Sequence, residues 1–466
     1  MQNSSKQKIN SLYILKVTLV ASAGGFLFGF DFVIISGALS FLDNSFQLSA
    51  AMKGLAVSSA VFGAILGPVA GLWFADMLGR KKTMMIAACF FMISTIGSAL
   101  AATIWGFVFW RFLGGIGVGL AMMTSPIYIA ELAPPHLRGS LVNVNQLSNV
   151  IGINLAVIVS YLFSFDGWGW RWMFASQAIP VILLIFGLLL IPESPRWLAA
   201  KNRIAEALKI LTKINGKENA ENELKEIQKE LTHKSGRFSD LFLPGTKTAL
   251  LIGIVLMIFS QINGINVTML YAPSILAEVG ITVGSNAILS SIPIFILVLI
   301  CTIISFKLID RFSRRGLLIT SVLFMVLSHV IMAINLQQQW PPLFTLIPML
   351  LGTGAFTIGF APLSWIIASE IFPNKIRSTA MGVVCVFLYG SSFLTVQFFP
   401  VLMEWFTGHY NSIAGIYWIF AVICLACVLF SWKMVPETKG LSLEKISEFW
   451  HDNKETKNLK KCHNIS

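Results

Sequence analysis

Long apolar stretches recur along the whole chain, and they constrain its fold more than any other feature. Each is about 20 residues long, the length at which an α-helix crosses the hydrocarbon core of a bilayer. Because no water is available there to satisfy backbone N–H and C=O groups, such stretches must be helical. Hydropathy predicts twelve of them, near residues 12–37, 52–75, 84–103, 106–130, 140–163, 173–191, 248–270, 286–308, 317–335, 343–368, 379–402 and 413–433. The sequence therefore predicts an all-α membrane protein with twelve transmembrane helices.

Positive charge is unevenly distributed over the loops. The chain has 34 basic and 22 acidic residues, a net charge of +12, and the excess gathers in alternate loops such as 80–82, 196–213 and 311–315. The intervening loops are nearly free of Lys and Arg. By the positive-inside rule the basic loops face the cytoplasm, so we expect both termini to be cytoplasmic. This pattern argues against nucleic-acid binding.

The two halves of the chain repeat each other. ADMLGRKK (75–82) corresponds to IDRFSRRG (309–316), and PIYIAELAPPHLRG (126–139) to PLSWIIASEIFPNKIRS (362–378). Asp310 lies 234 residues after Asp76, and Glu370 lies 239 residues after Glu131. We therefore predict an N-terminal six-helix bundle (1–195), a cytoplasmic linker of amphipathic helices (196–246), a C-terminal six-helix bundle (247–435) and a cytoplasmic tail (436–466). Parallel six-helix repeats are typical of transporters in which one half rocks against the other.

Charged residues of the repeated motifs stand where cytoplasmic helix ends meet. We expect them to form ion-pair clusters that hold the halves closed on that side and break when it opens. The alternative is that they only set topology, but acidic residues are not needed for that and still recur at matching places. The predicted gate comprises Asp76, Arg80, Glu131, Arg138, Asp310, Arg314, Glu370 and Arg377.

Eight motifs in order make the chain resemble the sugar porter family of the major facilitator superfamily over essentially its whole length. The chain looks similar to bacterial sugar–proton symporters of that family, such as those for xylose. The motifs are GGFLFGFD, DMLGRKK, RFLGGIGVGLA, PIYIAELAPPHLRG, PESPRWL, QINGINVTMLYAP, SEIFPNKIR and PETKGLSL. The resemblance implies two six-helix bundles, a place in the bacterial inner membrane and import of a sugar or polyol with a proton by alternating access.

The resemblance also implies the functional residues. Asp31 and Arg111 match the proton-coupling pair of the symporters. Residues that match sugar-binding or site-lining positions are Gln146, Gln261, Asn266, Tyr271, Phe360 and Trp365. Gln and Asn side chains both donate and accept hydrogen bonds, so they suit sugar hydroxyls without adding charge.

Several positions depart from the family pattern. The usual Gln-Gln pair is Ser260-Gln261, the Tyr-Tyr pair is Leu270-Tyr271, and Phe360 replaces a Trp. The substrate class is therefore left open among pentoses, hexoses and polyols such as inositol.

Asp31 lies in an apolar run, where an ionised group costs at least about 2.5 kcal/mol. Burial favours the neutral acid and an adjacent guanidinium favours the anion, so the residue can change protonation state between two conformations. The alternative is a permanent structural ion pair.

Two other functional classes would behave differently. A facilitative uniporter would show uptake that is insensitive to a protonophore, and a membrane nutrient sensor would bind sugar without flux. No GxxxxGK[ST] motif is present, and the GGIGVG cluster (114–119) lies in an apolar span. We predict no enzyme activity, no metal site, no cofactor and a monomer, and we expect His329 to serve helix packing, with a proton relay as the alternative.

Overall fold

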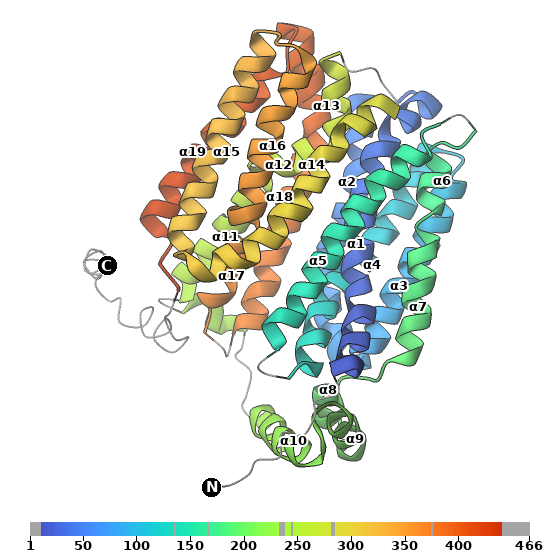
Figure 1. Ribbon diagram of the computed structural model, residues 1–466, viewed down its shortest axis with the longest axis vertical. Helices are drawn as coiled ribbons and strands as arrows, with labels where there is room; N and C mark the ends of the chain where they lie inside the picture. Colours follow the sequence, from blue (N-terminus) through green and yellow to red (C-terminus); the bar gives the residue numbers. More distant parts are fainter. Residues whose placement is uncertain are drawn as a thin grey trace. The chain divides into compact units, whose positions relative to one another are not determined.

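The computed structural model of the protein describes residues 11–134, 137–165, 167–232, 238–243, 246–280, 285–373 and 376–439. Every element within these ranges is helical (Figure 1). Among these described residues, twelve spans are long and apolar enough to cross a membrane. The predicted fold class is confirmed. The predicted tail beyond residue 439 lies outside the described residues.

The first half of the chain holds six spans followed by shorter helices. Their bounds are α1 Ser11–Phe46, α2 Ala50–Leu78, α3 Arg80–Leu100, α4 Ile104–Leu132, α5 Arg138–Leu162, α6 Trp170–Ala175, α7 Ala178–Leu190, α8 Pro195–Ala200, α9 Ile204–Asn215, α10 Lys217–Thr232 and η1 Phe238–Phe242.

The second half holds the remaining six spans. Their bounds are α11 Thr246–Ile262, α12 Ile265–Leu270, α13 Ala272–Glu278, α14 Ser285–Arg311, α15 Arg314–Gln337, η2 Pro342–Thr345, α16 Leu346–Ala355, η3 Phe356–Phe360, α17 Ala361–Glu370, α18 Arg377–Tyr410 and α19 Ala414–Met434.

Three spans are interrupted. The sixth breaks between α6 and α7 at Gln177, and the seventh breaks between α11 and α12 at Gly264, where φ is +87°. In the tenth, η3 is a π-helical turn between α16 and α17. Such interruptions free backbone groups from the regular ladder and are frequent at functional sites.

Contacts along the chain define two compact units. The first comprises Met1–His233, Leu270–Leu299 and Val396–Val401, and the second comprises Lys234–Met269, Ile300–Thr395 and Leu402–Ser466. The predicted bundle, linker and tail boundaries stay predictions.

Glycines draw the helices of the first unit together. Gly67 of α2 and Gly119 of α4 face each other so closely that a Cβ on either would overlap the backbone of the other. Gly29 of α1 meets the backbone of α5 at Asn149 in the same way. Small residues at helix interfaces permit this approach in membranes. Helix α1 packs against both α5 and α4.

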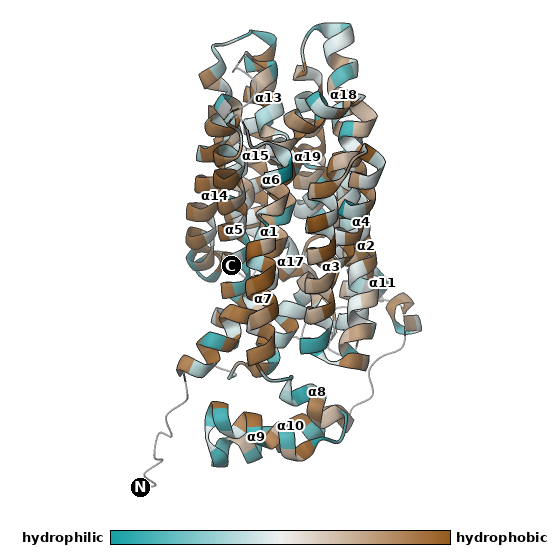
Figure 2. Ribbon diagram, turned by 90° about the vertical axis from the view of Figure 1, so that its right-hand side faces the viewer, coloured by the Kyte–Doolittle hydropathy of each residue, from teal (hydrophilic) through white to brown (hydrophobic). Residues whose placement is uncertain are grey.

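In the second unit, α15 is the central helix, since it packs on α19, α16 and η3, while α11 packs on α17. Brown apolar residues dominate the long spans in Figure 2, whereas α9 and α10 carry teal polar residues interspersed with brown apolar ones.

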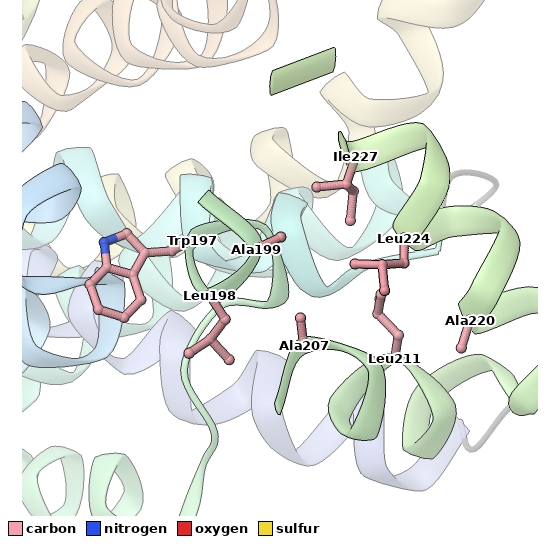
Figure 3. Packing of buried hydrophobic residues seen from close by; sticks show 8 residues of the cluster. All are labelled: Trp197, Leu198, Ala199, Ala207, Leu211, Ala220, Leu224 and Ile227. Carbon is pink, nitrogen blue, oxygen red and sulfur yellow. The ribbon is translucent and has the colours of Figure 1, made fainter. Parts of the chain in front are cut away.

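Helices α8–α10 of the first unit form a small apolar core of their own. Ser194 caps α8 by accepting a hydrogen bond from the Trp197 amide, and Pro195 occupies the first helical turn. Figure 3 shows the buried side chains of this core, which are Trp197, Leu198, Ala199, Ala207, Leu211, Ala220, Leu224 and Ile227. The predicted amphipathic helices thus bury one face among themselves.

Candidate functional site

Asp31 of α1 and Arg111 of α4 form a buried ion pair in the first unit. Asp31 is 2% exposed and Arg111 is 1% exposed. The Arg111 guanidinium donates from Nη1 to the Asp31 carboxylate, and from Nη2 to the Asp31 carbonyl oxygen at 3.3 Å. Its Cζ lies 5.4 Å from the centre of the Phe174 ring. The two residues singled out from the sequence are therefore in direct contact.

A third residue, which sequence reasoning missed, completes this site. Gln177 is buried at the interruption between α6 and α7, and its Nε2 donates to Asp31 Oδ1 at 3.2 Å. The one signal for it in the sequence is a lone amide side chain within an apolar span.

The contacts of Asp31 are those of a buried carboxylate with cationic and amide donors. The anion receives charge-assisted hydrogen bonds from Arg111, which offset the cost of a buried carboxylate.

The predicted ligand Gln146 projects from α5 and is exposed, although it lies within a membrane span. Its neighbour Asn145 is buried, and Asn145 Oδ1 accepts a hydrogen bond from Ser125 Oγ at 2.9 Å. In the described structure Gln146 is therefore the accessible amide of this pair.

Gln261 and Asn266 meet across the interruption of span seven in the second unit. Asn266 Nδ2 donates to Gln261 Oε1 at 3.1 Å, and Gln261 Nε2 donates to Ser260 Oγ at 3.1 Å. Both amides are only half-buried. They therefore keep hydrogen-bonding capacity for a polar ligand.

The three predicted aromatic residues differ in their surroundings. Trp365 of α17 is 38% exposed, whereas Phe360 at the end of η3 is fully buried. Tyr271, between α12 and α13, is also buried. Its hydroxyl donates to the Val396 carbonyl at 3.0 Å, and its ring centre lies 5.1 Å from that of Phe399. Only Trp365 of the three presents a substantial surface.

Three predicted gate residues of the first half, Asp76, Arg80 and Glu131, form an ion-pair cluster in the first unit. Arg80 pairs with Glu131 at 2.8 Å and with Asp76 at 3.2 Å. Glu193, to which the sequence analysis gave no role, accepts hydrogen bonds from the backbone amides of Arg80 and Lys81 at 2.9 and 3.1 Å. A carboxylate at these two amides satisfies the first turn of α3 and suits its dipole.

Arg138 is exposed on α5, and in the described structure Glu131 pairs with Arg80. Glu131 also accepts a hydrogen bond from Ser194 Oγ, a contact the sequence analysis did not foresee. Arg138 instead lies near Glu223 of α10, where it acts electrostatically on that carboxylate. Burial raises the pKa of Glu223, and the hydrogen bond from Asn215 and the Arg138 charge offset this only in part.

The second unit repeats the pattern. Arg314 pairs with Glu370, and Glu437 accepts hydrogen bonds from the amides of Arg314 and Arg315 at 3.0 and 3.2 Å. Arg377 donates to the Phe372 carbonyl at 3.3 Å, and Asp310 is exposed. In both halves the observed ion pairs therefore join helices of one unit. Within the described ranges no group of three or more His, Cys, Asp or Glu is placed to hold a metal ion.

Comparison with known proteins places these features in a family. The profile described as "Sugar (and other) transporter" matches residues 17–450. The chain is 37% identical over 448 residues to the arabinose-proton symporter of Bacillus subtilis, covering 94% of this chain and 95% of that protein. It is 36% identical over 476 residues to the D-xylose-proton symporter of Escherichia coli, covering 95% and 96%.

The fold is also similar to solved structures. The inward-open conformation of the xylose transporter XylE from Escherichia coli matches with a TM-score of 0.83 and 35% identity, over 94% of this chain and all of that chain. The xylose symporter bound to 6-bromo-6-deoxy-D-glucose matches with a TM-score of 0.78 over 95% of this chain.

Proposed function

The chain belongs to the sugar porter family of the major facilitator superfamily, and from this premise we propose that it imports a sugar or polyol together with a proton. The observation that carries the proposal is the buried pair of Asp31 and Arg111, with Gln177 as a further donor. The relatives with matching chains are named as proton symporters for arabinose, xylose and galactose. They are transporters, and we propose a transport function rather than an enzymatic one.

The contacts of Asp31 support a proton-coupling role for this residue. The anion is stabilised by Arg111, and protonation removes that attraction. The Gln177 amide can hydrogen-bond either form, because both offer an acceptor oxygen. Arg111 also donates to the Asp31 carbonyl oxygen and lies over the Phe174 ring, and these two contacts do not involve the carboxylate. Protonation thus biases one of two arrangements, which is what alternating access requires.

For substrate recognition we propose that Gln146, Gln261 and Asn266 hydrogen-bond the hydroxyls and that Trp365 covers the C–H face of the ring. The exposure of Gln146 and Trp365 supports this role. Tyr271 and Phe360 are proposed as site-lining residues that act through packing, since both are buried.

The named relatives favour a neutral pentose or hexose as the substrate. The departures at Ser260, Leu270 and Phe360 keep polyols such as inositol in the set to be tested. We further propose that the protein acts as a monomer in a bacterial inner membrane with both termini in the cytoplasm. The repeated charge clusters around Glu131 and Glu370 are proposed to act as cytoplasmic gates.

The test is uptake by the purified protein in liposomes, with radiolabelled arabinose, xylose, galactose, glucose and myo-inositol. An inward proton gradient should drive at least one of them to a concentration above the external one, and a protonophore should abolish that accumulation. Downhill entry that a protonophore does not change would identify a uniporter. Binding without flux would identify a sensor.

The substrate site is tested in the same liposomes. Gln261→Ala should raise the KM for the carried sugar, because a hydrogen bond to the ligand is lost. Gln337→Ala removes an exposed amide from the end of α15 and should leave KM unchanged. An unaltered KM in Gln261→Ala would remove this residue from the site.

A further inference from the structure

The interruption of span seven determines where two amide side chains point. Positions 261 and 266 are five residues apart, so on a continuous α-helix their side chains would diverge by about 140°. In the structure α11 ends at Ile262, Gly264 has a φ of +87°, and Asn266 donates to Gln261 at 3.1 Å. The amide pair therefore exists only because the helix is broken.

Asn263 joins the two broken ends. Its Nδ2 donates to the carbonyls of Phe259 and Ser260 at 3.0 and 2.7 Å, and its Oδ1 accepts from the Ile265 amide at 2.9 Å. The Asn263 side chain thus hydrogen-bonds backbone groups at the end of α11 and at the start of α12. The backbone carbonyl of Asn263 remains to be satisfied.

That carbonyl is satisfied by His329, which lies on α15 in the same unit. His329 Nε2 is 2.7 Å from the Asn263 carbonyl oxygen, and Cys424 Sγ of α19 approaches the same atom at 3.6 Å. Because a carbonyl oxygen only accepts, Nε2 must carry the hydrogen. A carbonyl without a donor is costly in the membrane interior, where no water replaces it.

The imidazole is held in one orientation. His329 is 1% exposed, and its ring centre lies 6.0 Å from that of Tyr417 and 5.6 Å from that of Phe420. The Phe420 ring also occupies the space that a Cβ on Gly264 would need. The Phe420 ring therefore packs against both His329 and the interruption of span seven that His329 binds.

We propose that His329 is a positioning residue of the sugar site, which holds the span-seven break and thereby aligns Gln261 and Asn266 for the substrate. The inference rests on the proposed function, because it takes these two amides as sugar ligands. His329 itself does not touch the sugar, and its role is to supply one hydrogen bond to the Asn263 carbonyl.

Three substitutions separate this role from simple packing. His329→Phe keeps a ring of similar size but has no donor. His329→Gln places an amide N–H at about the reach of Nε2, whereas His329→Asn carries the same amide one methylene short. If the Phe variant fails to fold, the Gln and Asn variants still form a matched pair, since both place a neutral amide in the same buried position. His409→Phe, at the exposed end of α18, is the control.

The first measurement needs no sugar. Hydrogen–deuterium exchange of the full-length protein in lipid nanodiscs should show lost protection at the Ile265 and Thr268 amides in His329→Phe and His329→Asn, and protection close to wild type in His329→Gln. Equal protection in all variants would overturn the proposal, whether or not the protein carries sugar.

The second measurement is counterflow of the sugar that the wild-type protein accumulates best. The Phe and Asn variants should raise KM about tenfold, the effect of a lost buried hydrogen bond, while the rate at saturation changes little. His329→Gln should restore KM. Lost protection with an unchanged KM would overturn the positioning role. Failure of the wild-type protein to carry any sugar would refute the proposed function. The exchange data would still show whether the His329 hydrogen bond holds the interruption of span seven.

Discussion

Asp31→Asn isolates the charge of the coupling site with little change in shape. Asn keeps an oxygen that can accept from Gln177, and Arg111 keeps its bond to the carbonyl of residue 31 and its contact with Phe174. The variant loses the carboxylate that can take up a proton. We therefore expect it to bind sugar and exchange it across the membrane, but not to concentrate it.

The size of the effect follows from the driving force. One charge that crosses about 100 mV releases roughly 2.3 kcal/mol, and each tenfold gradient costs about 1.4 kcal/mol. A single coupled proton thus supports about fortyfold accumulation, which should fall to about onefold in Asp31→Asn. Breaking a buried pair also costs about 3–5 kcal/mol when one partner is removed. The loss of stability should be smaller here because Arg111 retains two contacts.

The assay is uptake into proteoliposomes with an imposed membrane potential, followed by counterflow in its absence. Asp43→Asn is the matched control, because Asp43 lies on the same helix and pairs with Lys53 at 2.7 Å at a partly exposed position. It should accumulate sugar as the wild type does. Accumulation by Asp31→Asn at the wild-type level would refute the coupling role.

Three further perturbations test the architecture. Gln177→Leu removes a donor to Asp31 and should lower the initial rate of proton-driven uptake about tenfold, since a hydrogen bond to a charged group contributes about 1.5–3 kcal/mol. Gly119→Ala should lower the melting temperature in detergent, because the added methyl group would overlap Gly67 at a cost of about 1–3 kcal/mol. As the control, Gly139→Ala should leave the melting temperature unchanged, because a Cβ at position 139 meets no atom within 4 Å. Burial raises the pKa of Glu223, so its ionised form is disfavoured in the folded state. Glu223→Gln should therefore raise the melting temperature at pH 7, and the gain should shrink as the pH falls through the raised pKa.

Features that depend on local composition could be predicted from the sequence. The twelve spans follow from hydropathy, because an apolar stretch of this length has one stable form in a bilayer. The contact between Asp31 of α1 and Arg111 of α4 was predicted through the family resemblance, and these two helices pack against each other in the structure.

Contacts that depend on the path of the chain could not be predicted. Glu131 and Arg138 are seven residues apart, but they lie on different helices with a loop between them, so their spacing carries no contact information. Glu131 instead pairs with Arg80, 51 positions earlier in the chain. The role of Gln177 depends on the break in span six, which hydropathy does not reveal.

The hydrogen bond from His329 could not be predicted from the sequence either. Its partner is a backbone carbonyl that becomes available only because span seven is interrupted at Gly264. Sequence reasoning predicted that this histidine serves packing, and the structure confirms that it is buried. The hydrogen bond that it donates belongs to the tertiary structure and has no sequence signature.

The most direct test of proton–sugar symport is to drive the proton with the sugar. Wild-type protein is reconstituted into liposomes that contain a pH-sensitive dye, with no imposed pH gradient and the membrane potential clamped at zero. Addition of the carried sugar outside should acidify the lumen as the sugar enters, and a protonophore should abolish the signal. Sugar entry at an undiminished rate with no change of internal pH would contradict the account.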